Sequence, residues 1–200
     1  MKVFLATANL HKIKEIKKVL ENVPEIEIIT LKDGVIVPDV IEDGKTFEEN
    51  SIKKAVETAK YMGMITIADD SGLCVEALNG APGVYSARYA GRHGNDLDNN
   101  KKLVENLKNI ENRNAKFVCV ITIANKDGEY KTFYGEMYGK IIDEPLGTNG
   151  FGYDPHFYLI DYDKTVAEIS DEKKNEISHR GMALKNLKKI INETLKELSK

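Results

Sequence analysis

Two adjacent carboxylates stand in the middle of the chain, directly after an apolar run. Residues 66–68 lead into Asp69 and Asp70, and Ser71 and Gly72 follow at once. This order predicts a buried strand that ends in carboxylates at a sharp turn, which is where α/β proteins usually bind their ligand. Carboxylates that lose water together are costly unless a metal, a cation or a proton compensates them. Taken together with three other polar clusters of the chain, the pair indicates a magnesium-dependent enzyme that acts on phosphates.

Further acids precede this pair and could belong to the same metal site: Glu42, Asp43, Glu48 and Glu49. Hard oxygen ligands suit Mg²⁺, which usually takes one or two carboxylates together with substrate phosphate and water. Neighbouring strand residues point to opposite faces, so only one of Asp69 and Asp70 should enter the site if the strand continues. Glu48 and Glu49 fall in an expected first helical turn, where acids complement the helix dipole, and we favour that structural role for them.

A polar segment near the N-terminus could bind a polyphosphate. It comprises Thr7, Ala8, Asn9, Leu10, His11 and Lys12, and it lies where an expected strand meets an expected helix. Free amides at a helix N-terminus attract anions, and Thr7, Asn9 and Lys12 add a hydroxyl, an amide and a cation. The segment matches neither a Walker loop nor a dinucleotide fingerprint. The alternative is that Asn9 only caps the helix while Lys12 lies in solvent.

A glycine-rich loop with two aromatic residues forms a third cluster, over residues 147–155. Its three glycines let the backbone approach a planar ligand closely, and Phe151 or Tyr153 could stack on that ligand. A tight turn with core aromatics accounts for the same composition equally well.

The fourth cluster covers residues 174–181. Ser178 is expected to cap the last helix, which puts His179 and Arg180 in its first turn. Because cations there oppose the helix dipole, a purely structural role suits them poorly. We interpret His179 and Arg180 instead as hydrogen-bond donors to a ligand that is rich in acceptors.

Hydrophobic periodicity predicts the elements that must position these clusters. Strands are expected at residues 2–7, 25–31, 64–68, 117–124, 129–142 and 157–160, and helices at 10–21, 46–62, 97–107 and from 178 onward. Residues 46–49 resemble a capping box. Residues 32–45, 72–95 and 143–155 are expected to be loops, and 126–128 the turn of a hairpin. Strand–helix alternation followed by a hairpin predicts an α/β fold with a mixed sheet.

Two expected helices carry apolar stripes that should face the core. The first stripe comprises Leu10, Ile13, Ile16, Val19 and Leu20, and the last comprises Met182, Leu187, Ile190, Ile191, Leu195 and Leu198. These residues recur at helical spacing, so we expect both helices to pack on the sheet.

Composition bounds the class of protein. The 200 residues, 42% of them hydrophobic, suffice for one substantial domain with a continuous core. A net charge of −3 gives no support for nucleic-acid or membrane-surface binding. The N-terminus turns polar too soon for a signal peptide, and no apolar stretch could span a bilayer, so a cytoplasmic location is expected. Cys74 and Cys119 stand in apolar runs and are expected to be reduced core residues.

The four clusters, in this order, resemble the inosine triphosphate pyrophosphatase family, which hydrolyses non-standard purine nucleoside triphosphates. The resemblance extends from Thr7 to Arg180, essentially the whole chain. The motifs that carry it best are residues 68–73 (ADDSGL), 80–88 (GAPGVYSAR), 150–155 (GFGYDP) and 178–180 (SHR). Each motif alone is weak, but four in the right order make a chance similarity implausible.

The resemblance implies a role for each cluster. The segment from Thr7 to Lys12, with Ala8 where many members carry glycine, would bind the triphosphate. Glu42 and Asp70 would hold Mg²⁺, with Asp39 and Asp43 as alternatives to Glu42, and Asp70 would also be the catalytic base. The remaining substrate-binding positions would be Ser71, Phe151, Gly152, Tyr153, Asp154, Lys174, His179 and Arg180.

The resemblance also implies the architecture and the substrates. It predicts a single bilobed domain over residues 1–200, with an elongated mixed sheet flanked by helices and a nucleotide cleft between two lobes. It further implies a homodimer that acts on ITP, dITP and XTP. Two other enzyme or protein classes remain as alternatives: a phosphohydrolase that releases orthophosphate, and a nucleotide sensor without turnover. Dense carboxylates beside a phosphate site disfavour the sensor, since a pure binder gains little from acids near anions unless a metal intervenes.

Overall fold

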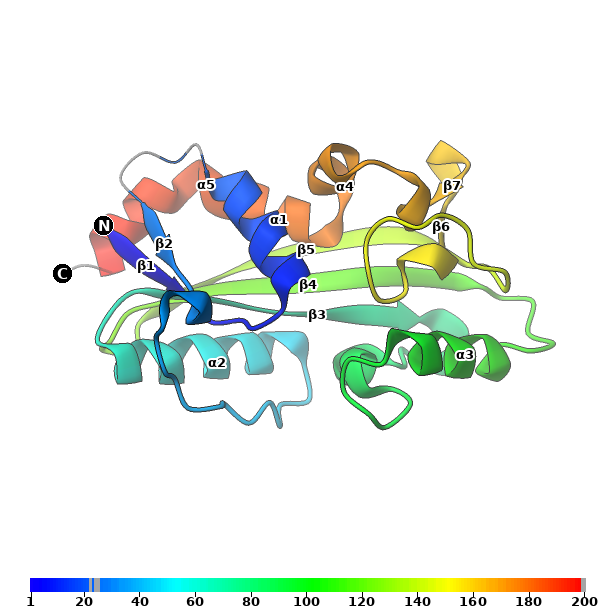
Figure 1. Ribbon diagram of the computed structural model, residues 1–200, viewed down its shortest axis with the longest axis horizontal. Coiled ribbons are helices and arrows are strands. Elements are labelled where there is room, and N and C mark those ends of the chain that lie inside the picture. Colours follow the sequence, from blue (N-terminus) through cyan, green and yellow to red (C-terminus); the bar gives the residue numbers. More distant parts are fainter. Residues whose placement is uncertain (22, 24–25, 199–200) are drawn as a thin grey trace. The chain divides into compact units, whose positions relative to one another are not determined.

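A computed structural model describes residues 1–21, 23 and 26–198 (Figure 1). The helices are α1 (Leu10–Leu20), α2 (Phe47–Met62), α3 (Asp96–Asn106), α4 (Asp171–Ile177) and α5 (His179–Leu198). The strands are β1 (Lys2–Leu5), β2 (Glu27–Ile29), β3 (Thr66–Val75), β4 (Asn114–Ala124), β5 (Tyr130–Ile141), β6 (Phe157–Leu159) and β7 (Lys164–Thr165). Short 3-10 turns connect several of these elements.

The chain forms two compact units. Unit 1 comprises residues 1–70, 119–135 and 180–200, and unit 2 comprises residues 71–118 and 136–179. The boundaries of the units fall within β3, β4 and β5 and after the first residue of α5, so each of these elements contributes residues to both units.

The strands within the described residues form a seven-stranded sheet in the order β2-β1-β3-β4-β5-β6-β7. Strand β1 pairs in parallel with β2 and β3, whereas β5, β6 and β7 pair antiparallel. The expected α/β fold with a mixed sheet is therefore confirmed. The expected turn between β4 and β5 is also present, closed by the amide of Asn125, which donates to the carbonyl of Glu129.

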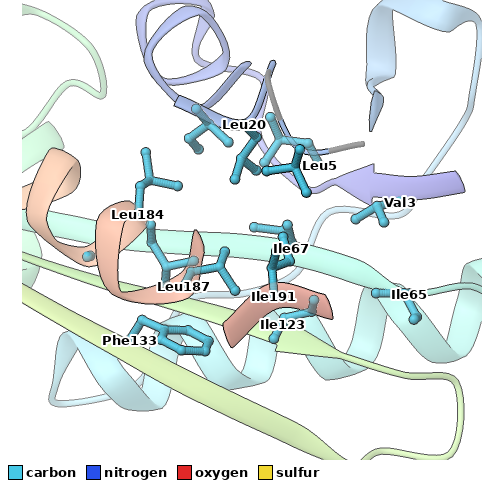
Figure 2. Packing of buried hydrophobic residues seen from close by; sticks show 14 of the residues in the cluster. Val3, Leu5, Leu20, Ile65, Ile67, Ile123, Phe133, Leu184, Leu187 and Ile191 are labelled. Atoms are coloured by element: carbon cyan, nitrogen blue, oxygen red, sulfur yellow. The ribbon is translucent and has the colours of Figure 1, made fainter. Parts of the chain in front are cut away.

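Helices cover both faces of the sheet in unit 1. Helices α1 and α5 pack on one face, where Leu184, Leu187 and Ile191 of α5 point toward Ile67 and Phe133 of the strands (Figure 2). Helix α2 covers the opposite face through a smaller cluster that is rich in alanine (Figure 1). Since the connections from β1 to β2 and from β2 to β3 lie on opposite faces, β1 marks a topological switch point, a common ligand position in such folds.

The helix boundaries follow from their caps. Asn9 caps α1 by accepting from two backbone amides, and Thr46 and Glu49 form the expected capping box of α2. Gly63 ends α2 with φ of +63°, a backbone conformation that favours glycine. The structural interpretation of Asn9 and of Glu49 is thereby confirmed.

Three residues of the expected apolar stripes are exposed, contrary to prediction. Leu10, the first residue of α1, is 55% exposed. Met182 and Ile190 are also partly exposed. The buried stripe of α5 runs instead through Ala183, Leu184, Leu187, Ile191, Leu195 and Leu198, whose spacing matches one helix face.

Strand β3 corrects the most prominent prediction. The strand does not end at the two acids but continues through Gly72 to Val75, and residues 72–75 are therefore not loop. Leu73 and Val75 are buried in the core of unit 2. The strand is not interrupted at the acids, and neighbouring residues of a strand point to opposite faces of the sheet.

Other differences are smaller. Strand β2 is shorter than expected, and Glu25, the first residue predicted for it, lies outside the described residues. Helix α4 and strand β7 were not predicted, because their seven and two residues are too short for a periodic pattern. Cys119 is buried and Cys74 half-buried, and both are free thiols, as expected. Across the described helices, none is both long and apolar enough to cross a membrane.

Candidate active site

The two acids lie just beyond the end of β1. Leu5, the last residue of β1, is opposite Ile67, so the edge of β3 is not covered by β1 at Asp69 and Asp70. Because β3 continues through both acids, their side chains point to opposite faces of the sheet. The sequence predicted this arrangement on the condition that the strand continues. Asp69 contacts residues of α1 and α5, whereas Asp70 contacts α2.

Asp69 is fully buried between two cations. Its Oδ2 lies 2.9 Å from Nζ of Lys12 and 3.2 Å from Nη2 of Arg180. Burial disfavours the charged carboxyl, but Lys12, Arg180 and Lys54 outweigh burial and hold the pKa of Asp69 well below its usual range. Its other oxygen, Oδ1, is buried and accepts no hydrogen bond from any described residue.

Arg180 is held by carboxylates on both sides. Its Nη1 donates to Glu15 of α1, and its Nε and Nη2 donate to Asp69. Arg180 therefore has two structural carboxylate partners, which the sequence did not indicate. Burial opposes the charge of the guanidinium, but the carboxylates of Asp69 and Glu15 keep its pKa above the ordinary value. Glu15 was not singled out in the sequence, where it is one of several charged residues on an amphipathic helix.

Asp70 accepts a hydrogen bond from a neutral side chain, that of Asn50. The side-chain amide of Asn50 donates to Oδ2 of Asp70 at 3.0 Å. Burial raises the pKa of Asp70 to about 6, although Lys12 and Lys54 act to lower it. A carboxyl with this pKa is a suitable general base near neutral pH. The two adjacent acids thus have opposite pKa shifts: the charges of Lys12, Arg180 and Lys54 outweigh burial at Asp69, whereas burial outweighs the charges of Lys12 and Lys54 at Asp70.

The loop before α2 brings further charge to Asp70. Glu42 of this loop pairs with Nζ of Lys54 at 2.6 Å, and its charge acts on Asp70. The neighbouring Asp43 pairs with Lys53 at 2.7 Å. Burial lowers the pKa of Lys54, but Asp69, Glu42 and Asp70 raise it by more. Lys54 was not singled out from the sequence, since one lysine among several on a helix carries no distinguishing pattern.

The Thr7–Lys12 segment is ordered by its own side chains. Asn9 Oδ1 accepts from the amides of His11 and Lys12 at 3.0 and 3.2 Å, and the amide of Asn9 donates to the hydroxyl of Thr7. Ala8, Leu10 and His11 are exposed in this segment. Lys12 does not lie in solvent, because it pairs with Asp69, so this part of the structural alternative is wrong.

The carboxylates around Asp70 fit a magnesium ion that is completed by its substrate. No three His, Cys, Asp or Glu side chains within the described part of the chain converge on a metal position. Mg²⁺ needs no such protein cage, since it commonly binds one or two carboxylates together with phosphate oxygens and water. Glu42 and Asp70 are the carboxylates that would suit this binding mode, since Glu42 lies near enough for its charge to act on Asp70.

Unit 2 contains a second polar cluster around Asp154 and Lys174. The Nζ of Lys174 lies 2.7 Å from Asp154 Oδ2, with both side chains almost fully buried, and 4.5 Å from the centre of the Phe151 ring. Asp154 Oδ2 also accepts from the amide of Phe151. Gly150 has φ of +77°, and a side chain there would collide with Asp154. This arrangement fixes the half-buried Phe151 ring beside a cation, so that it can stack on a planar ligand.

Other predicted positions of unit 2 have structural partners. The amide of Gly152 donates to Asp96, and its carbonyl accepts from Asn100. Tyr153 is buried, with its hydroxyl on the carbonyl of Ser86. These contacts support the turn-and-core interpretation for Tyr153 and Gly152. Asp96 and Asn100 were missed because they lie on a separate helix, far away in the sequence.

His179 lies against an aromatic ring of the unit 2 core. It is buried, and its imidazole stacks on Phe117 with ring centres 4.8 Å apart. Phe117 contacts Phe157 in turn. Ser71 is half-buried at the start of the part of β3 that belongs to unit 2. As predicted, His179 and Arg180 occupy the first turn of α5.

The motif at residues 80–88 has a structural role that the sequence did not disclose. Ser86 accepts from the amide of Leu73 and donates to the carbonyl of Gly83. Gly72 must lack a side chain because Ser86 and Gly83 approach it too closely for a Cβ. This segment therefore supports β3 directly after the acids.

The fold and the site together define an α/β protein with a buried carboxylate–cation cluster beyond the end of a parallel strand. A sequence model described as the Ham1 family matches residues 3–190. The chain is 51% identical over 203 residues to a dITP/XTP pyrophosphatase of Clostridium perfringens, covering 98% of this chain and 99% of that protein. The solved Ham1 protein of Staphylococcus aureus shares 44% identity with a TM-score of 0.88, covering 97% of this chain and all of that one. A HAM1 protein from Coxiella burnetii shares 42% identity with a TM-score of 0.89, covering 96% and 99%. This chain belongs to the Ham1 family, and the family resemblance inferred from the sequence is confirmed.

Proposed function

We propose that this protein hydrolyses non-standard purine nucleoside triphosphates, namely ITP, dITP and XTP, to the monophosphate and pyrophosphate. This reaction would remove them from the nucleotide pool. The proposal is supported by relatives named dITP/XTP pyrophosphatase, whose sequences are 47–51% identical to this chain over nearly its whole length. The observation that carries it is the Asp69–Asp70 pair, desolvated beyond β1 beside Lys12 and Lys54.

The cluster in unit 1 is assigned to the triphosphate and the metal. Lys12 and the Thr7–Lys12 backbone bind phosphate oxygens, and Ser71 contacts the substrate. Glu42 and Asp70 hold Mg²⁺, which supplies electrostatic stabilisation of the phosphate oxygens when bound. Asp69 does not act on the substrate in this scheme but fixes Lys12 and Arg180 through the contacts described above.

Asp70 is assigned as the catalytic base. Its carboxylate takes a proton from water, or orients that water, for attack on the α-phosphorus. The bond from the α-phosphorus to the bridging oxygen breaks, and pyrophosphate leaves. Lys12 neutralises charge that moves toward the leaving group. The pKa of about 6 leaves Asp70 ionised at neutral pH and still basic enough to accept a proton.

The cluster in unit 2 is assigned to the purine. Phe151 provides the stacking ring, with Gly152, Tyr153, Asp154, Lys174 and His179 as the further positions. The family resemblance assigns Arg180 to the base as well. Hypoxanthine and xanthine carry an acceptor oxygen at position 6, whereas adenine carries a donor. Donors in the site would face another donor when ATP binds, and unpaired buried polar groups give strong discrimination.

A substrate panel tests the proposed reaction. Purified protein is given ITP, dITP, XTP, GTP or ATP, with Mg²⁺ or with EDTA, and pyrophosphate and orthophosphate are measured separately. We expect Mg²⁺-dependent pyrophosphate release from the first three, with ATP slower by about 100-fold or more. Orthophosphate as the first product, or equal rates for ITP and ATP, would refute the proposal.

The proposal extends to assembly and location. We infer a homodimer that works in the cytoplasm, on the strength of the family resemblance. Light scattering during size-exclusion chromatography tests the assembly. A mass equal to the 22.4 kDa chain at micromolar concentration would argue against the dimer.

A further inference from the structure

Two consecutive lysines of α2 pair with two consecutive acids of the preceding loop. Lys54 Nζ lies 2.6 Å from Glu42, and Lys53 Nζ lies 2.7 Å from Asp43. The two pairs differ in burial. The Lys54 and Glu42 side chains are 15% and 29% exposed, whereas those of Lys53 and Asp43 are 32% and 68% exposed. The chain thus provides two ion pairs of similar chemistry, one of them in the candidate active site.

Lys54 acts on both assigned metal ligands. Its ammonium pairs with Glu42, and its charge also acts on Asp70 and Asp69. Lys12 is a second lysine whose charge acts on Asp70, and its ammonium lies 2.9 Å from Asp69. Lys54 is therefore the lysine that is ion-paired with Glu42, an assigned metal ligand.

We propose that Lys54 is the resident counter-ion of the metal site. Its ammonium takes the place of a divalent cation at Glu42 in the metal-free protein and leaves this carboxylate when the metal binds. Lys54 is thus a positioning residue that keeps Glu42 near Asp70 and sets the affinity for metal. The inference rests on the proposed function, since that function assigns Glu42 and Asp70 to Mg²⁺.

The net charge of the cluster explains how Lys54 would control the affinity for a divalent ion. Four carboxylates, those of Glu15, Glu42, Asp69 and Asp70, face the three cations Lys12, Lys54 and Arg180. A divalent ion alone would leave the cluster with excess positive charge. The negative charge of a triphosphate more than offsets this excess, so the metal binds weakly by itself and tightly together with the substrate. Without Lys54, the cluster would accept the ion alone.

Metal binding in the absence of nucleotide tests the exchange. Mn²⁺, which replaces Mg²⁺ on oxygen ligands, is titrated at pH 8 and followed by water-proton relaxation, which extends to millimolar dissociation constants. The proteins are the unmodified chain, Lys54→Met, Lys54→Gln, Lys53→Met and Glu42→Gln. Thermal unfolding checks that each variant is folded, and the Gln variant replaces the Met variant if the latter is not.

Removing Lys54 is expected to strengthen Mn²⁺ binding by roughly tenfold or more, because a competing cation and its repulsion are lost. The matched variant Lys53→Met should leave the affinity unchanged, and Glu42→Gln should weaken it. Unchanged or weaker binding in both Lys54 variants would overturn the inference.

A different result would count against the proposed function instead. If Glu42→Gln binds Mn²⁺ as the unmodified protein does, the assignment of Glu42 as a ligand fails. Pyrophosphate release by the unmodified protein is measured in the same preparation, and it tests the reaction independently of the role of Lys54.

Discussion

At the scale of single residues, Asp69 and Asp70 show how position decides the chemistry of identical side chains. Both are buried, yet Asp69 is paired with Lys12 and Arg180 while Asp70 accepts from the neutral Asn50. Their pKa values consequently move in opposite directions. Asp69 contributes stability through its ion pairs, whereas Asp70 costs stability and is suited to catalysis.

Asp70→Asn should abolish pyrophosphate release while making the metal-free protein more stable. The folded pKa of Asp70 is raised from 3.8 to about 6, so its carboxyl costs stability increasingly as the pH rises through this range. The full effect is about 3 kcal/mol above pH 6 and vanishes below about pH 4. Urea unfolding in EDTA at pH 8 and at pH 4 measures it. A variant that is less stable at pH 8, or one that retains near-full activity, would contradict these assignments.

Asp69→Asn should have the opposite effect on stability. Loss of the buried carboxylate leaves Lys12 and Arg180 without this partner, which typically costs about 3–5 kcal/mol. Because the folded pKa of Asp69 is lowered, its contribution is present above the unfolded pKa near 4 and is lost as the pH falls further. The difference in unfolding free energy between the two proteins should therefore shrink from pH 7 to pH 3. Asp43→Asn, at an exposed pair, serves as the control and should change little.

At the scale of elements, the start of α1 combines a helix cap with the assigned phosphate site. Asn9 Oδ1 accepts hydrogen bonds from the amides of His11 and Lys12 and so orders the first turn of the helix. This turn places Lys12 on the helix face that contacts Asp69. The two interpretations of this segment are thus compatible, since the cap orients the cation.

Asn9→Ala should cost about 1 kcal/mol of stability and raise the KM for ITP, because the cap and the direction of the first turn are lost. Asn95→Ala removes the comparable cap of α3 and should cost similar stability with unchanged KM. Chemical unfolding and steady-state kinetics of both variants make the comparison. Equal KM values in the two variants would show that the α1 cap has no role in substrate binding.

At the scale of the whole molecule, metal binding and folding stability should be linked. A ligand that binds the folded chain stabilises it in proportion to its concentration relative to Kd. Mg²⁺ together with a non-hydrolysable ITP analogue should therefore raise the melting temperature by more than the sum of their separate effects. The same additions should have little effect on Glu42→Gln. Additive shifts in the unmodified protein would argue against a shared metal–triphosphate site.

The sequence alone determined the class of fold, most helix boundaries and the four polar clusters. These features depend on local physics, namely apolar periodicity, capping residues and glycine-rich turns, so they can be read over a few neighbouring residues. The family resemblance added the expected reaction, which no local pattern contains.

The tertiary structure decided which side chains of the clusters contact one another. It showed that β3 continues through Asp69 and Asp70, where residues of α1 and α5 contact Asp69 and a residue of α2 contacts Asp70. It also identified Lys54, Glu15 and Asn50, whose positions in the sequence resemble those of any polar helix residue. Such contacts join residues that are up to 165 positions apart in the chain, and the pKa of a buried group depends on those distant charges. Only the folded chain brings them together.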